Sequence, residues 1–140
     1  MKKLAVLFIA LTASLTSCNN DDDATTSAEL QGKWEYSKEG TITNGVEALT
    51  DYNHEVGCPR DFVIIDASNY KDHSFETEEC LETVDTTPYT RNGNTITVTD
   101  NGTILTGTIT QLDNSTLKIK RTFGLGEGQG IELVTVFTRK

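Results

Sequence analysis

The sequence predicts a small all-β domain. From residue 30 onward no apolar repeat at helical spacing is sustained, whereas short runs rich in Thr, Ile and Val alternate with turn signals. The chain has 140 residues, of which 36% are hydrophobic, and this is enough for one small domain with a packed core. Turn dipeptides such as Asn92-Gly93 can adopt the positive φ angles that tight hairpins require. The expected architecture is therefore a consecutive antiparallel meander.

Nine strands are expected, each a short run rich in β-branched and aromatic residues that a turn signal ends. In order they cover residues 32–38, 41–48, 60–66, 70–79, 87–91, 94–99, 103–111, 116–123 and 131–139. The separating turn signals are residues 67–69, Asn92-Gly93, Asn101-Gly102, Asp113-Asn114 and the glycines at 124, 126, 128 and 130. Residues 49–59 are assigned to a loop or a short helical turn.

The expected strand at 60–66 contains four consecutive apolar residues, so both of its faces need cover. We expect one face to line the core and the other to lie under the 49–59 segment. An exposed apolar patch for a partner is the alternative.

The charge balance is strongly acidic. Twelve Lys and Arg stand against 21 Asp and Glu, which gives a net charge of -9. Binding that depends on phosphate contacts requires a basic surface. Nucleic acid is therefore excluded as an expected partner.

The N-terminal segment carries a targeting signal. Lys2 and Lys3 precede an apolar run that is too short to span a bilayer, so residues 1–17 are expected to be a signal peptide. The sequence Leu15-Thr16-Ser17-Cys18 resembles the lipobox of bacterial lipoproteins. The resemblance implies that Cys18 is acylated and becomes the mature N-terminus, which would attach the protein to a membrane through its lipid. A plain secretory signal with a chance cysteine is the alternative.

Residues 18–29 are expected to form an acidic tether, and residues 30–140 the folded domain. Three consecutive aspartates, residues 21–23, follow Cys18 after two asparagines and resemble the export signal that carries lipoproteins to the outer face in some Gram-negative groups. This implies a lipid-anchored protein of the bacterial outer membrane that is displayed on the cell surface. A solvated spacer is the other interpretation.

If Cys18 carries lipid, Cys58 and Cys80 remain as a pair in an oxidising compartment. In a hairpin that turns at residues 67–69, cross-strand partners would have residue numbers that add to 136–138. The two cysteines would then lie almost opposite each other at the open end of the hairpin. We therefore expect a Cys58–Cys80 disulfide, with metal or redox use of the thiols as the alternative.

No catalytic constellation is found. The two histidines are His54 and His73, and no Gly-x-Ser-x-Gly motif is present. The sequence therefore lacks the set of residues that nucleophilic catalysis requires. The sequence thus predicts a protein that is not an enzyme and that has no cofactor and no metal site. His73 shares strand parity with Phe75 and can point inward, where a hydrogen-bonded core or rim histidine is the more common role.

An acidic run lies along the expected strand 70–79. Alternation places Asp72, Ser74, Glu76 and Glu78 on one face. A solvated outer face explains the run, and a cation site that relieves the repulsion is the alternative.

Residues 30–139 resemble the small lipocalin-like domain of bacterial lipoproteins. The resemblance rests on Gly32-Lys33-Trp34, Cys58 before Asp61-Phe62, Cys80 after the next strand, and the segments 92–98, 109–117 and 137–139. It implies a closed up-and-down antiparallel β-barrel of about eight strands. It also implies a structural barrel floor, in which Trp34 of the Gly32-x-Trp34 motif packs beneath Arg139.

Two functions follow from this resemblance. The first is a non-catalytic binding module for a small apolar ligand, with ligand-binding residues that the sequence does not identify. The second is a structural or surface-interaction protein with a filled barrel that contacts other envelope or host macromolecules. The short strands favour a filled interior.

Replacing Cys18 by Ser is expected to abolish lipid attachment, because the acyl groups would be linked to this cysteine. Cells that express the wild type or Cys18→Ser are labelled with a palmitate analogue and fractionated. The wild type should carry the label and sediment with membranes. A Cys18→Ser chain that still incorporates label and stays with the membranes would contradict the prediction.

Overall fold

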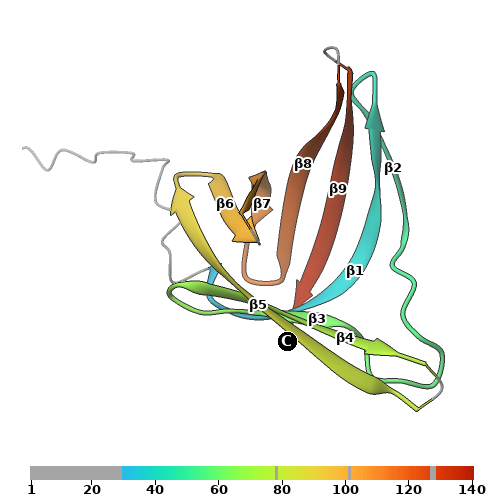
Figure 1. Ribbon diagram of the computed structural model, residues 1–140. Coiled ribbons are helices and arrows are strands. Elements are labelled where there is room, and N and C mark those ends of the chain that lie inside the picture. The colour runs from blue at the N-terminus through green and yellow to red at the C-terminus, as the bar shows by residue number, and fades with distance from the viewer. Residues whose placement is uncertain (1–29, 78, 101, 127–128) are drawn as a thin grey trace, which may run out of the picture.

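The computed structural model describes residues 30–77, 79–100, 102–126 and 129–140. The signal peptide, Cys18 and the tether expected within residues 1–29 lie outside this range, as do Glu78, Asn101 and Gly128. The strands, shown in Figure 1, are β1 (Gly32–Thr43), β2 (Val46–Asp51), β3 (Phe62–Ile65), β4 (Asn69–Glu76), β5 (Leu81–Asn92), β6 (Thr95–Asp100), β7 (Thr103–Leu112), β8 (Thr116–Gly126) and β9 (Gln129–Arg139).

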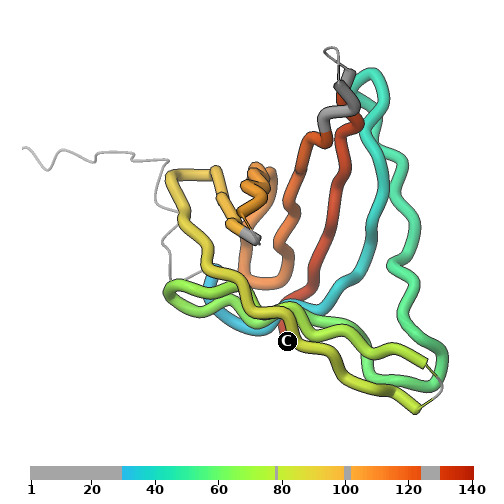
Figure 2. Tube along the Cα trace, in the orientation of Figure 1, coloured from blue at the N-terminus to red at the C-terminus, as the bar shows by residue number. Residues whose placement is uncertain are grey.

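The strands form one antiparallel sheet that closes on itself. The hydrogen-bonded order is β2-β1-β3-β4-β5-β6-β7-β8-β9, and β1 also pairs with β9. Figure 2 shows the last strand running beside the first. Eight strands therefore make a closed barrel, and β2 is an additional strand on β1. The expected all-β, eight-stranded barrel is confirmed.

The long strand β1 has two partners along one edge. Its first residues, 32–35, pair with β3, whereas residues 38–43 pair with β2. The other edge pairs with β9, and the register of that ladder shifts between Tyr36 and Lys38. Because β3 is only four residues long, it leaves the second half of β1 free for the β2 hairpin. The meander is thus consecutive from β3 onward but not at its start.

Two expected strand boundaries are wrong. The first hairpin turns at Asn44-Gly45, where both residues have positive φ (52° and 78°), as a two-residue type I′ turn requires. The chain therefore continues as strand through Thr43 and resumes at Val46, instead of breaking between residues 38 and 41. The strand expected at 87–91 begins at Leu81, since residues 81–88 pair with β4 although most of their side chains are exposed.

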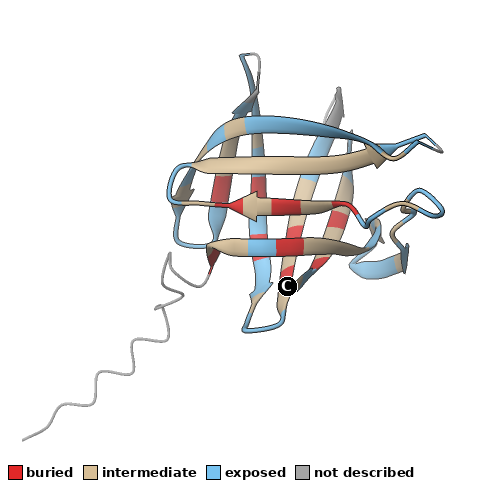
Figure 3. Ribbon diagram, turned by 90° about the horizontal axis from the view of Figure 1, so that it is seen from below, coloured by how far each residue is buried: buried red, intermediate tan, exposed pale blue. Residues whose placement is uncertain are grey.

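Large apolar side chains fill one end of the barrel. The buried core consists of Leu30, Trp34, Val63, Ile65, Ile96, Ile109, Leu117, Ile119 and Phe137. Figure 3 shows the buried positions on several strands, while the hairpin tips are exposed. These residues come from six separate stretches of the sequence, so only closure of the sheet brings them together.

Trp34 and Arg139 form the floor of this core. Trp34 is fully buried, and its Nε1 donates a hydrogen bond to the Leu30 carbonyl oxygen at 2.8 Å. The Arg139 guanidinium lies over the indole, 4.2 Å from the ring centre, and donates to the Gln31 carbonyl oxygen at 3.2 Å. Gly32 has a φ of 138°, and a Cβ there would lie 3.2 Å from Arg139 Nη1. The Gly-x-Trp motif thus supplies both the stacking partner and the room for the arginine.

The apolar strand β3 is covered on both faces. Val63 and Ile65 face the core and are buried. On the outer face, Phe62 stacks on His73 with ring centres 4.4 Å apart, and Lys33 Nζ lies 3.6 Å from the Phe62 ring centre. The outer cover expected from the 49–59 segment therefore comes from neighbouring side chains. Phe62 and Ile64 are both half-buried, so the apolar side chains of this outer face are partly covered.

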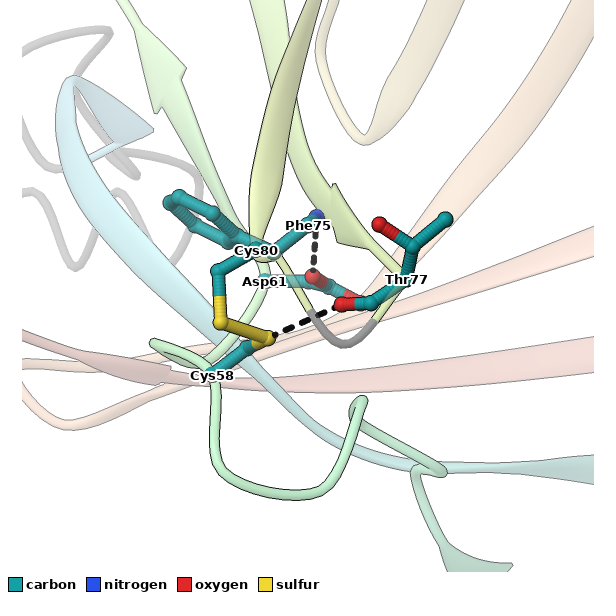
Figure 4. Close-up of a disulfide and its surroundings, with 5 residues drawn as sticks. All are labelled: Cys58, Asp61, Phe75, Thr77 and Cys80. Atoms are coloured by element: carbon teal, nitrogen blue, oxygen red, sulfur yellow. Dashed lines mark hydrogen bonds between the residues drawn. A yellow bond between two sulfur atoms is a disulfide. The ribbon is translucent and has the colours of Figure 1, made fainter.

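Cys58 and Cys80 are joined by a disulfide, as expected, with Cα atoms 5.3 Å apart (Figure 4). The hairpin register differs from the expected one by one residue, because Phe62 pairs with His73. Both cysteines lie outside this ladder, one in the loop before β3 and the other in the turn after β4. The bridge spans 22 residues, and a loop of this size corresponds to about 3.4 kcal/mol of stabilisation in the chain-entropy treatment.

Trp34 and Arg139 are expected to contribute to stability as a coupled pair. Unfolding free energies are measured in urea for Trp34→Phe, Arg139→Ala and the double variant. An arginine over an indole is worth about 0.5 to 2 kcal/mol, so the two losses should be non-additive by a similar amount. Additivity within about 0.3 kcal/mol would show that the stacked contact does not stabilise barrel closure.

Candidate functional site

A cavity of about 310 Å³ lies inside the barrel, at the lower end of the range of small-molecule pockets. Much of its wall is apolar and comes from β6 to β9, through Ile96, Val98, Leu105, Ile119 and Phe137. Three of these side chains, Ile96, Ile119 and Phe137, also belong to the packed core. The cavity is therefore continuous with the core at one end.

The cavity exists because several inward positions carry small side chains. Thr87, Gly107 and Thr135 all line it. A Cβ at Gly107 would lie only 2.8 Å from Ile119 Cγ2 and 3.3 Å from Arg121 Cγ. The glycine thus keeps this part of the wall thin. A completely filled interior, which the short strands favoured, is not what the structure has.

Two tyrosines and an aspartate form a hydrogen-bonded chain on one wall. The Tyr36 hydroxyl donates to Asp72 Oδ2 at 3.1 Å and lies 3.2 Å from the Tyr70 hydroxyl. Because Tyr36 donates its one hydroxyl proton to the aspartate, its oxygen accepts the hydrogen bond from the Tyr70 hydroxyl. Within the described residues, Asp72 Oδ1 is buried and has no hydrogen-bond partner. The two phenolic donors of this wall are therefore used within the wall, whereas Asp72 Oδ1 is an acceptor without a donor among the described residues.

Burial and neighbouring acids shift the ionisation of this group. Burial is the largest cause that raises the pKa of Asp72, and the charges of Asp61 and Asp85 raise it further. Asp85 also lines the cavity and stands directly opposite Asp72 in the β4–β5 ladder, where like charges repel. Burial likewise raises the pKa of Tyr36 and Tyr70 far above the ordinary value. Both phenols are thus protonated at neutral pH.

The segment before β3 positions Tyr36. Tyr52 stacks on Tyr36 with ring centres 4.6 Å apart, and burial is the main cause that raises the Tyr52 pKa to about 12. His54 Nε2 donates to the Tyr36 carbonyl oxygen at 3.0 Å, while Nδ1 accepts from the Asp61 backbone N–H at 3.0 Å. These two bonds require the neutral imidazole with its proton on Nε2.

The same segment is tied to the end of β4. The buried Asp61 accepts a hydrogen bond from the Phe75 backbone N–H at 2.9 Å (Figure 4). The nearby Cys58–Cys80 bridge joins the same two stretches of chain. The disulfide and Asp61 therefore hold the segment that carries Tyr52 against the barrel.

Arg121 faces the cavity from β8, which lies four strands from β4 around the eight-stranded barrel. Its guanidinium carbon is 5.8 Å from the Phe123 ring centre. Its charge is one of the causes that lower the pKa of Tyr70, although burial outweighs it. The cavity thus has two carboxylates on one wall and a guanidinium on the opposite wall.

The structure places two sequence-predicted features differently. His73 lies on the outer face of the barrel, where its Nδ1 is 2.8 Å from Glu82 Oε1. Asp72 faces the interior, so the interpretation of its strand face as a solvated outer face is wrong for this residue. Alternation explains both results, because neighbouring residues of a strand point to opposite faces. Within the described part of the chain no three His, Cys, Asp or Glu side chains gather as a metal site.

Sequence reasoning missed the polar wall. Tyr36 follows Trp34 by two residues, so it shares the inward parity of the floor tryptophan. Tyr70 and Asp72 likewise share one parity on β4, where they pair directly with the buried Ile65 and Val63 of β3. Parity alone could have placed these side chains inside, but not the distances between them.

Comparison with known proteins shows the fold class. No family model and no curated protein matches this chain. Among solved structures, a lipocalin-like protein from Bacteroides uniformis matches with a TM-score of 0.54 and 14% identity, covering 80% of this chain and 99% of that one. Lobster apocrustacyanin A1 matches with a TM-score of 0.53 and 14% identity, covering 82% of this chain and 63% of that one. The fold is thus lipocalin-like. Across the described residues, no helix is long and apolar enough to cross a membrane.

Replacing Asp72 by Asn is expected to raise the unfolding free energy of the ligand-free protein at neutral pH. Folding raises the pKa of this carboxyl, chiefly through burial. The ionised group therefore opposes folding, and its cost develops as the pH rises above the unfolded-state pKa of about 3.9. Urea unfolding between pH 3 and 7 should show Asp72→Asn more stable than wild type at pH 7, with the difference vanishing at the acid end.

Asp51→Asn is the control of opposite sign, because a hydrogen bond from Lys38 lowers the pKa of Asp51. It should be slightly less stable than wild type at pH 7 and equal to it at low pH. An Asp72→Asn variant that is less stable than wild type at pH 7 would contradict the assignment of Asp72 as a half-buried carboxylate whose desolvation opposes folding.

Proposed function

We propose that this protein is a non-catalytic binding module that holds one small ligand inside its barrel. The observation that carries the proposal is the cavity of about 310 Å³ with its largely apolar wall. A cavity of this size has room for one small molecule, whose burial against apolar side chains supplies binding free energy.

The architecture supports this function in two ways. An eight-stranded barrel encloses an interior that suits either a packed core or a single small ligand, and here the chain combines both. The closed floor at Trp34 seals one end, so that apolar surface above it is sheltered from water. The hydrogen-bonded ladder around the barrel keeps the cavity walls rigid, which lowers the entropic cost of binding.

The alternative of a structural protein with a filled barrel has less support. Its premise is an interior occupied by the protein's own side chains, whereas small residues such as Gly107 and Thr135 leave room in this one. Contacts with other macromolecules remain compatible with a ligand-binding barrel.

The proposal includes the location that the N-terminal sequence predicts. Acylation of Cys18 would attach the domain to the bacterial outer membrane, and the acidic residues 19–29 would act as the spacer. The lipobox resemblance and the three aspartates after it support this location. A ligand-binding domain held this way would take up small molecules at the membrane surface.

Binding of the neutral apolar fluorophore N-phenyl-1-naphthylamine tests the cavity. The wild type should enhance its fluorescence saturably, because the dye leaves water for an apolar site. Leu105 lines the cavity, and Leu105→Trp should weaken binding about tenfold or more, equal to about 1.4 kcal/mol, by occupying its space. Ile104, the next residue on β7, is 68% exposed, and Ile104→Trp is the matched control that should bind like wild type. Equal binding by both tryptophan variants would place the dye outside the barrel and overturn the proposal.

A further inference from the structure

The wall of the cavity formed by β4 and β5 is built for a ligand that donates hydrogen bonds. Asp72 Oδ2 receives the Tyr36 hydroxyl, whereas the buried Asp72 Oδ1 receives no donor among the residues described. Buried acceptors are nearly always satisfied in folded proteins. In this chain the two phenolic protons are already spent within the wall. The two phenols of this wall therefore offer no further donor, and the wall presents acceptors and negative charge to a ligand.

The same wall also lacks a positive charge. Asp85 lines the cavity and stands opposite Asp72 in the ladder, and two carboxylates in such a pair repel each other. Arg121 belongs to the far wall, and no ion pair joins it to either aspartate in the described ranges. His73, on the next position of β4, points to the outer face and contacts Glu82. A ligand cation beside Asp72 and Asp85 would relieve this repulsion.

A metal ion does not meet these requirements. Calcium takes six to eight oxygen ligands, and magnesium requires a near-octahedral set. The described chain brings no three acidic, histidine or cysteine side chains together for a metal. The remaining wall, from Ile96 to Phe137, is largely apolar. The missing cation is therefore an organic one with an apolar body.

We propose that the ligand of this cavity is a small amine, whose ammonium group binds the carboxylates of Asp72 and Asp85 and whose apolar body fills the space toward β6 and β7. This inference rests on the proposed binding function and specifies its ligand class. An ammonium has three N–H donors and one positive charge, and hydrogen bonds between ionised partners are about twice as strong as neutral ones. A hydroxyl would supply one donor but would leave the two carboxylates uncompensated.

Three ligands with the same eight-carbon chain test the proposal: octylamine, 1-octanol and octanoate. Each is titrated at pH 7 against the full chain loaded with N-phenyl-1-naphthylamine, and the concentration that displaces half of the dye is measured. Octylamine should displace the dye at a concentration about tenfold lower than octanol, and octanoate should be the weakest of the three. The apolar bodies are identical, so the ratios report the head group alone.

Two variants each remove one charge, one on each side of the cavity. Asp72→Asn should raise the octylamine concentration to that of octanol and leave octanol unchanged. Arg121→Gln is the matched control on the opposite wall, and it should leave octylamine binding as tight as in wild type or tighter. Circular dichroism and the retained binding of octanol show that each variant is folded.

The possible results separate the two proposals. If the dye itself fails to bind, the binding function and the amine specificity are both overturned. If the dye binds but octylamine and octanol displace it equally, only the amine proposal fails. If octanoate is the tightest ligand and Arg121→Gln abolishes its advantage, the cavity recognises an anion through Arg121, and the amine proposal is wrong.

Discussion

Closure of the sheet between β1 and β9 is the constraint on which the rest of this structure depends. The two strands pair along almost their whole length, from Trp34 opposite Arg139 to Ile42 opposite Glu132. Without that pairing the sheet would have two open edges and no interior. The stacked Trp34 and Arg139 hold the closure at one end, and the absence of a Cβ at Gly32 leaves room for the arginine. The core and the cavity both follow from this contact.

The barrel divides its interior between stability and binding. Large apolar side chains pack near the floor, while small residues such as Gly107 leave a cavity farther along. The cavity contains a half-buried carboxylate, Asp72, that costs stability as the pH rises. The floor contact, the packed core and the Cys58–Cys80 bridge offset this cost. Destabilising polar groups of this kind are typical of binding sites rather than of structural cores.

Local chain geometry positions the polar wall. Beyond Tyr36 the strand β1 shifts register and exchanges its partner β3 for β2. The segment 52–61 fills the gap between the diverging strands, and its Tyr52 and His54 contact the Tyr36 ring and backbone. The Tyr36 hydroxyl is thereby held within reach of Tyr70 and Asp72. Irregularities in a sheet are common next to functional sites because they redirect a side chain.

The sequence by itself indicated the elements and the floor: short runs rich in β-branched residues, separated by turn signals, predicted nine strands, and the resemblance to lipocalin-like domains implied the pairing of Trp34 with Arg139. The disulfide followed from the cysteine count. Only the tertiary structure decided that the interior is hollow and that Tyr36, Tyr70 and Asp72 meet on one wall. Their positions are separated by 34 and 36 residues. Contacts at such separation depend on the register of strands paired around a closed barrel, and local sequence patterns carry little information about that register.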